Sequence, residues 1–71
     1  MSNADLKKLG NKIRLLRHQG QLTQEQLSEL TDLHRTYIGG IERGERNVSL
    51  LNLIRIAKAL HITVSKMLED I

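Results

Sequence analysis

Apolar residues recur every three or four positions along most of the chain, the spacing that places them on one face of an α-helix. In the N-terminal third, this apolar stripe consists of Leu6, Leu9, Ile13 and Leu16. It predicts a helix from about Ala4 to His18, which Gly20 ends. No segment sustains the alternation of apolar and polar residues that predicts a β-strand. We therefore expect an all-α protein.

The C-terminal third predicts two more helices, each beginning with a residue that can cap a helix N-terminus. Ser49 can cap a helix with the apolar positions Leu50, Leu53, Ile54, Ala57 and Leu60. Thr63 can cap a last helix, about residues 63–70, with the apolar positions Val64, Met67, Leu68 and Ile71. This last helix has more apolar surface than one edge of so small a core needs. We therefore predict that these four positions and Ile62 form a dimer interface.

The middle of the chain predicts two short helices about a tight turn. Thr23 is a good N-cap residue, and Gln26 stands where the partner of a capping box belongs. Leu27 and Leu30 follow at core spacing. The first of the two helices is therefore expected from about Gln24 to Thr31.

Asp32 falls in the turn after this helix, where a residue that tolerates the left-handed backbone is favoured. A second helix is predicted to begin near His34. Its apolar positions are Leu33, Ile38 and Ile41, and the broadly opposite face carries Arg35, Thr36, Gly39 and Arg43. Residues 23–44 thus predict a helix-turn-helix, a motif whose second helix presents its first residues to base edges in the major groove of DNA.

Composition limits the kinds of protein that this chain can be. Its 71 residues suffice for one domain, residues 1–71, and so short a domain often gains stability from a partner subunit, so we expect a homodimer. The lack of cysteine suits the cytoplasm, and the apolar runs are far shorter than the roughly 20 residues that cross a membrane. His18, His34 and His61 are too widely spaced to indicate a metal site, and no catalytic constellation is evident. We expect no metal, no cofactor and no enzymatic activity.

The charge balance favours a polyanionic partner. The formal net charge is +3 and the sequence pI is about 9.7. Because Tyr37 is the one aromatic residue, the chain offers no stacking platform for unpaired bases, and duplex DNA is the expected target. Basic residues also crowd the first helix, where a solvated helix face is a simpler interpretation than contact with DNA. These residues are Lys7, Lys8, Lys12, Arg14 and Arg17.

The segments TQEQL, HRTYI, IERGERN and LLNLIRIAKAL, in this order, resemble the lambda-repressor-like family of bacterial and phage regulators. The resemblance covers nearly the whole chain. Within the family, the stretch LHRTYIGGIERGERNVSLLNLIRIAKAL is most similar to the controller proteins of restriction-modification systems. The resemblance implies a compact five-helix domain and a transcription regulator that activates and represses at a palindromic operator. A phage-type repressor and an antitoxin-type autoregulator with the same fold are the alternatives.

Four residues at the start of the second helix of the motif are candidates for contact with DNA. The Arg35 guanidinium can donate two hydrogen bonds to guanine, and a phosphate contact is its alternative. Thr36 can bond a base edge or place its methyl group against thymine, unless it only starts the helix. Tyr37 can fill a seam between helices while its hydroxyl reaches DNA, and the resemblance implies the DNA contact. For His34, a phosphate contact and a surface position without a special role are equally open.

The resemblance implies further contacts with DNA and one ion pair. Gln24 matches a family residue that meets a phosphate at the helix N-terminus, and an ordinary cap-region residue is its alternative. The loop after the second helix is expected to extend the contact along the backbone through Arg43, Arg46 and Asn47, unless the loop is merely solvated. Arg17 and Glu42 match positions that form a structural ion pair.

Gly39 and Gly40 are unusual inside a helix, because each costs roughly 1 kcal/mol relative to alanine. A cost of that size suggests close approach of the backbone to DNA or to a neighbouring helix. Many family members hold a larger polar side chain here that reads bases. Specificity is then expected to depend more on Arg35, Thr36 and the shape of the DNA.

Glu25 and Glu29 place two carboxylates one helical turn apart beside the expected DNA-facing surface. Activators of the family use such a patch to touch RNA polymerase, so the sigma subunit is a possible partner, and a solvated face that balances nearby bases is the alternative. A two-fold dimer sets its two recognition helices roughly 34 Å apart, which predicts an inverted-repeat operator with half-sites one helical turn apart. The expected location is the bacterial cytoplasm, at the nucleoid when DNA is bound.

Overall fold

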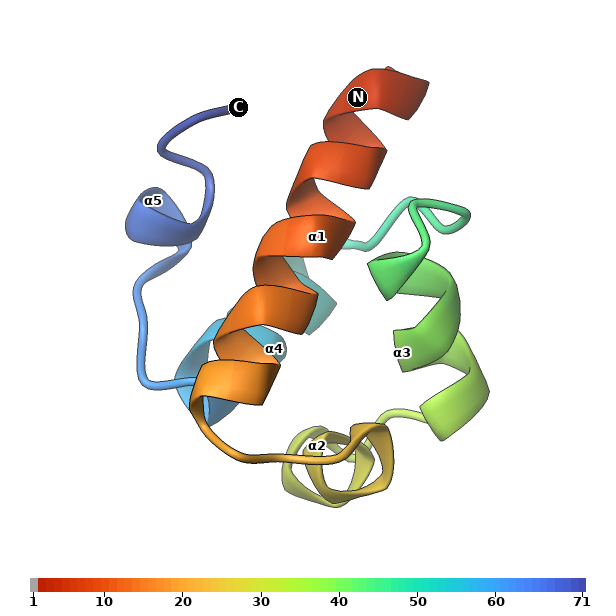
Figure 1. Ribbon diagram of the computed structural model, residues 1–71, viewed down its shortest axis with the longest axis vertical. Coiled ribbons are helices and arrows are strands. Elements are labelled where there is room, and N and C mark those ends of the chain that lie inside the picture. The colour runs from red at the N-terminus through yellow and green to blue at the C-terminus, as the bar shows by residue number, and fades with distance from the viewer. Residues whose placement is uncertain (1) are drawn as a thin grey trace.

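The computed structural model describes residues 2–71, and this part of the chain forms five α-helices and no strand (Figure 1). The helices are α1 (Asn3–Gln19), α2 (Gln24–Thr31), α3 (Arg35–Glu42), α4 (Leu50–Ala59) and α5 (Val64–Met67). The predicted all-α class is confirmed, the bounds of the first two helices agree closely with those expected, and α3 and α4 begin where predicted. The last helix is shorter than predicted, because turns replace the helix after Met67.

The predicted N-terminal caps explain why these helices begin where they do. Side-chain oxygens of Thr23, Ser49 and Thr63 each accept a hydrogen bond from the backbone N–H three residues further on. At α2 the capping box is complete, because the Thr23 backbone N–H also donates to Gln26 Oε1 over 2.8 Å. The start of the helix-turn-helix is therefore determined locally by its own sequence.

The chain leaves α1 through a left-handed residue that is not the glycine expected to end the helix. Gly20 has a φ of −81°, whereas Gln21 has a φ of +57°. This conformation allows the Leu22 backbone N–H to donate to the Arg17 carbonyl oxygen over 3.0 Å, which closes the last turn. The left-handed backbone conformation costs about 1 kcal/mol or more at a residue other than glycine.

Replacing Gln21 with glycine is therefore expected to stabilise the fold. The relief of about 1 kcal/mol in a domain of this size raises the Tm by about 5 °C. Thermal unfolding followed by circular dichroism measures the change. Gln19→Gly is the matched control, because Gln19 is exposed and helical, and glycine there should lower the Tm. Equal effects of the two substitutions would contradict this account.

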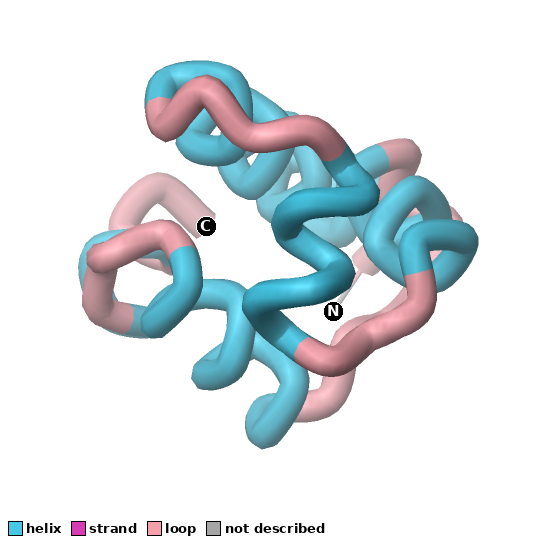
Figure 2. The backbone as a smooth tube through the Cα atoms, turned by 90° about the horizontal axis from the view of Figure 1, so that it is seen from below, coloured by secondary structure: helices cyan, strands magenta, loops and turns pink. Residues whose placement is uncertain are grey.

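The five helices enclose one aliphatic core. α1 packs against α3 and α5, α2 packs against α3 and α4, and α4 packs against α5. Seen from below, α2 lies across the near side, with a short loop at each end (Figure 2). The buried apolar residues are Leu9, Ile13, Leu27, Ile38, Ile41, Val48, Leu53, Ile56, Ala57 and Met67. Among residues 2–71, no helix is long and apolar enough to cross a membrane.

Two leucines that the sequence pattern assigned to the core lie on the surface. Leu30 is 61% exposed and Leu50 is 68% exposed. In α2, the inward position one turn after Leu27 is taken by Thr31, whose buried hydroxyl donates to the Leu27 carbonyl oxygen over 2.8 Å. Leu50 is the first residue of α4, and the buried positions of that helix begin only at Leu53.

Two glycines that the sequence analysis did not single out let α1 and α3 approach closely. A Cβ atom at Gly10 would lie 2.3 Å from the Ile41 carbonyl oxygen, so the two helix backbones touch at their crossing. Gly44, with a φ of +76°, follows α3, and a Cβ atom there would lie 2.9 Å from Lys7 Cα. The position of α3 relative to α1 is thus set by backbone contacts.

Candidate nucleic-acid interface

α2 and α3 form the predicted helix-turn-helix. Asp32 adopts the left-handed backbone expected in the turn, with φ of 60° and ψ of 30°. The Ser28 hydroxyl donates to the carbonyl oxygen of Leu33 and closes the turn. His34 then caps α3 with an extended backbone and an exposed imidazole that makes no capping hydrogen bond. The local sequence therefore positions the start of α3.

Most residues of α3 lie on the face, buried or exposed, that the sequence predicts for them. Ile38 and Ile41 are buried in the core, whereas Arg35 and Thr36 are exposed in the first turn. Within residues 2–71, neither the Arg35 nor the Thr36 side chain forms a hydrogen bond or an ion pair with another part of the molecule. Both are therefore available to a partner molecule.

Tyr37 connects α3 to α4. Its side chain is half-buried against the core, and its hydroxyl oxygen accepts a hydrogen bond from Asn52 Nδ2 over 3.3 Å. The ring thus fills a seam between helices, as one sequence interpretation expected. The partner Asn52 was not foreseen, because no local pattern joins two residues 15 positions apart. The phenolic proton stays available for donation to a further acceptor.

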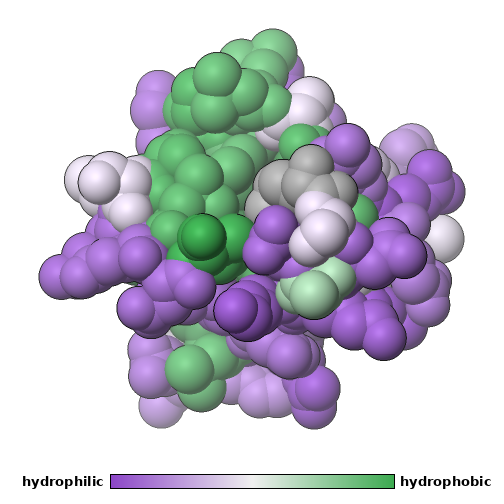
Figure 3. Space-filling view, turned by 90° about the horizontal axis from the view of Figure 1, so that it is seen from above, coloured by the Kyte–Doolittle hydropathy of each residue, from purple (hydrophilic) through white to green (hydrophobic). Residues whose placement is uncertain are grey.

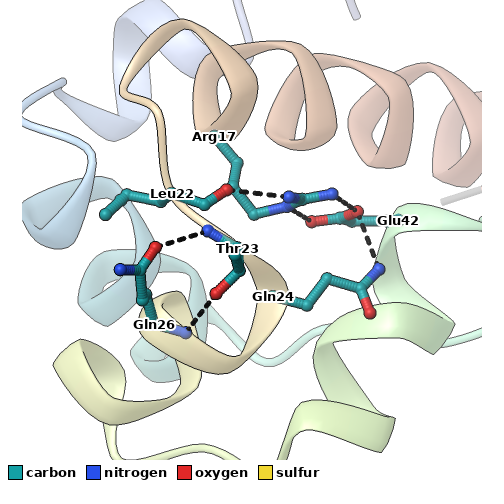
Figure 4. A network of polar contacts seen from close by, with 6 residues as sticks. All are labelled: Arg17, Leu22, Thr23, Gln24, Gln26 and Glu42. Carbon is teal, nitrogen blue, oxygen red and sulfur yellow. Dashed lines mark hydrogen bonds and ion pairs between the residues drawn. The ribbon is translucent and has the colours of Figure 1, made fainter.

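A buried ion pair joins α1 to the end of α3, as the family resemblance implied (Figure 4). Arg17 Nε donates to Glu42 Oε2 over 2.7 Å, and Arg17 Nη2 donates to Glu42 Oε1 over 2.9 Å. Arg17 Nη1 donates to the carbonyl oxygen of Leu22 in the loop before α2 over 2.9 Å. This bidentate geometry satisfies both charges and ties three segments together.

The side chain of Gln24 extends this network from the first turn of α2. Its Nε2 donates to Glu42 Oε1 over 3.1 Å, and the side chain is half-buried. The sequence analysis gives two interpretations of Gln24, a contact with a phosphate and an ordinary residue of the cap region. The structure adds a role that neither interpretation included, since Gln24 links the N-terminus of α2 to the C-terminus of α3.

Polar side chains also cover the glycine pair of α3. A Cβ atom at Gly39 would lie 3.0 Å from Arg43 Nη1, and a Cβ atom at Gly40 would lie 2.8 Å from Arg46 Cγ. The expected close approach of a neighbouring helix holds at Gly39, where the Gln24 side chain of α2 lies 3.5 Å from the Cβ position, whereas at Gly40 the nearest atoms belong to Arg46 of the following loop. The glycines give Arg43 and Arg46 room to lie along α3.

The loop after α3 presents the remaining candidates to solvent. Arg43, Arg46 and Asn47 are exposed, and Arg43 Nε lies 3.1 Å from Glu45 Oε1 in an exposed ion pair. On α2, Glu25 and Glu29 are exposed. The structure describes no group of three potential metal-ligating side chains in residues 2–71.

The arrangement fits the geometry of duplex DNA. An α-helix fits the major groove, which is about 12 Å wide, and α3 projects Arg35 and Thr36 from a frame anchored by buried contacts. The capped start of α2 and the basic loop after α3 flank this helix. The fold and the site together define a helix-turn-helix DNA-binding transcription regulator.

Comparison with known proteins places the chain more narrowly. It belongs to the helix-turn-helix family HTH_3, whose model matches residues 13–67. Control protein C.SmaI of Serratia marcescens is 53% identical over 60 residues, which cover 84% of this chain and 71% of that protein. Control protein C.MunI of a Mycoplasma species is 46% identical over 65 residues, 90% of this chain and 88% of that protein.

A solved structure confirms the fold. The restriction-modification controller protein C.AhdI from Aeromonas hydrophila is 48% identical and superposes with a TM-score of 0.88, covering 90% of this chain and 97% of that chain. The controller C.Esp1396I, solved as a tetramer in complex with its natural 35-base-pair operator, is 37% identical with a TM-score of 0.82. That match covers 92% of this chain and 90% of the other.

Proposed function

We propose that this regulator is the controller of a restriction-modification system and binds an inverted-repeat operator as a homodimer in the bacterial cytoplasm. The observation that carries the proposal is the exposed first turn of α3, where the Arg35 and Thr36 side chains form no hydrogen bond or ion pair within residues 2–71 and stand on a rigid frame. Similarity to several control proteins supports the controller role. The same similarity leaves the phage-type repressor and the antitoxin-type autoregulator with less support.

The contacts with DNA divide into base reading and backbone positioning. Arg35 and Thr36 read base edges at the start of α3, where a helix-turn-helix meets the major groove. The exposed loop residues Arg46 and Asn47 and the N-terminus of α2 contact phosphates. His34 and the Tyr37 hydroxyl lie beside these groups and add contacts at the edge of the surface. Gln24 serves by holding α2 against α3.

The dimer interface is the apolar surface around α5. Ile62, Val64 and Leu68 are half-buried, and Ile71 at the chain end is 39% exposed. Seen from above, the face near the two chain ends carries a continuous apolar area beside a hydrophilic one (Figure 3). Met67, which the sequence analysis included in this interface, is fully buried in the core and is removed from it. Its side chain has no surface to offer a second subunit.

Selection of bound duplexes from a random pool tests the proposed function directly. We expect enrichment of an inverted repeat, and a gel-shift titration of the selected duplex should show two subunits bound per repeat. The half-sites should be centred one helical turn apart, roughly 34 Å. Absence of enrichment over random duplex would refute sequence-specific binding, and one subunit per selected site would refute the dimer.

The exposed carboxylates of α2 are proposed to contact RNA polymerase. Glu25 and Glu29 lie one turn apart on the surface of α2, and neither takes part in an ion pair within residues 2–71. The double substitution Glu25→Gln with Glu29→Gln is expected to abolish activation in transcription with purified polymerase while operator affinity stays unchanged. The double substitution Asp5→Asn with Asp32→Asn is the control, because it changes the net charge equally at residues outside the proposed DNA and dimer contacts. Full activation by the α2 variant would rule out the proposed contact between these carboxylates and RNA polymerase.

A further inference from the structure

A groove between α1 and α3 is lined by basic and polar side chains. Its exposed rim consists of Lys7, Asn11 and Arg14 from α1, together with Arg43 at the end of α3. The floor consists of the Arg17–Glu42 ion pair and Gln24. α1 and α3 pack directly against each other, so the two walls are fixed (Figure 1).

The charge of this groove is positive, and the two cations that α1 contributes to its rim are uncompensated within residues 2–71, whereas Arg43 pairs with Glu45. The floor carboxylate of Glu42 is neutralised by Arg17, with which it forms two hydrogen bonds. Within the described residues 2–71, Lys7 and Arg14 form no ion pair. The neighbouring Lys12 differs, because its Nζ lies 3.7 Å from Asp70 Oδ2 on another side of α1. On the side of α1 that faces the groove, Lys7 and Arg14 are therefore free cations, whereas on the side of Lys12 only Lys8 is free within residues 2–71.

The rim residues of α1 form a straight stripe that leads to the reading helix. Lys7, Asn11 and Arg14 recur at the spacing of one helical face, and exposed His18 continues that face. Asn11, Arg14 and His18 line a second hollow, and His18 and Arg35 line a third. The stripe is thus continuous with the surface on which Arg35 stands.

We propose that this stripe on α1 is a second contact with duplex DNA, which binds phosphates of the strand that flanks the bases read by α3. The inference rests on the proposed DNA binding and names a further part of the same partner. At 1.5 Å per residue, Lys7 and Arg14 lie about 10 Å apart along α1, so the two cations are far enough apart to meet different phosphates of one strand. Asn11 lies between them, and its side-chain amide can donate a hydrogen bond to a phosphate oxygen.

The backbone contacts of α1 explain why this surface is suited to a rigid partner. Gly10 lies against the Ile41 carbonyl oxygen, and Gly44 lies against Lys7 Cα. These contacts hold the stripe at a constant distance from α3. The residues that read bases on α3 and those that bind phosphates on α1 are therefore held in one fixed arrangement. Phosphate binding by the stripe then orients the duplex relative to Arg35.

The salt dependence of operator binding tests the proposal. Each phosphate contact contributes about 0.9 to the slope of log K against log salt. The double variant Lys7→Gln with Arg14→Gln should therefore show a slope shallower by about 2 per protomer. Its affinity should fall at least tenfold at 0.1 M salt, by a similar factor for operator and random duplex. An unchanged slope in a variant that still folds and binds would overturn the proposal.

The matched control removes one arginine and one lysine elsewhere. Arg55 and Lys58 are exposed on α4 and line a different hollow with Leu30 and His61. The double variant Arg55→Gln with Lys58→Gln changes the net charge equally and is expected to retain the wild-type slope. An equal loss in both variants would overturn the proposal in favour of a net-charge effect. Failure of the unmodified protein to bind any duplex would instead refute the proposed function.

Discussion

Replacing Glu42 with alanine is expected to lower the free energy of unfolding by about 3–5 kcal/mol, because the substitution leaves the buried guanidinium of Arg17 without its partner. A domain of 71 residues has a total stability of about 4–11 kcal/mol, so the variant should be largely unfolded or close to its midpoint at low urea concentration. Urea titration followed by circular dichroism measures the loss.

Two further variants separate the buried charge from a general effect of substitution. Glu69→Ala removes an exposed carboxylate that lies 3.7 Å from Lys66 Nζ, and it should change stability by less than about 1 kcal/mol. The double variant Arg17→Met with Glu42→Leu removes both charges together and should recover most of the lost stability. If Glu42→Ala were as stable as the unmodified protein, the ion pair would not hold the three segments together.

Replacing Arg35 with alanine is expected to reduce discrimination between the operator and its single-base variants by about 5- to 150-fold, the equivalent of 1–3 kcal/mol. Because the Arg35 side chain is exposed and forms no hydrogen bond or ion pair with the described part of the chain, the fold should stay intact. Competition gel shifts with operators altered one base pair at a time measure the loss, which should be confined to one position in each half-site.

Other arginines provide the contrast for Arg35. Arg46→Ala should weaken binding to all duplexes about equally and make the salt slope shallower by about 1 per protomer, since a phosphate contact carries no sequence information. Arg55→Ala, at an exposed position of α4, should leave both quantities unchanged. Should Arg35→Ala keep the full operator preference, another residue of α3 reads the bases.

Local sequence signals were sufficient to predict most of the fold. The caps at Thr23, Ser49 and Thr63 are hydrogen bonds over three residues, so a reader of the sequence sees both partners. The left-handed turn at Asp32 is local in the same sense. The exposed start of α3 also followed from periodicity, because buried Ile38 and Ile41 determine which side faces outward.

The features that escaped prediction depend on contacts between distant segments. Nothing near Gly10 in the sequence indicates that α3 crosses α1 at that residue, and the bond between Asn52 and Tyr37 spans 15 positions. The exposure of Leu30 depends on where α4 meets α2, and there a threonine takes the inward position. The spacing of apolar residues predicts which face of a helix is buried, but it does not predict which residues of that face another helix covers.

The first turn of α3 separates recognition from folding. Buried pairs and backbone contacts hold the frame, whereas Arg35 and Thr36 contribute no internal bond within residues 2–71. Exchanging these two side chains costs the fold little, so a new operator can be acquired by a few codon changes without first gaining stability elsewhere. A regulator built in this way can follow a drifting promoter, and related regulators in one cell can diverge until each ignores the DNA of the others.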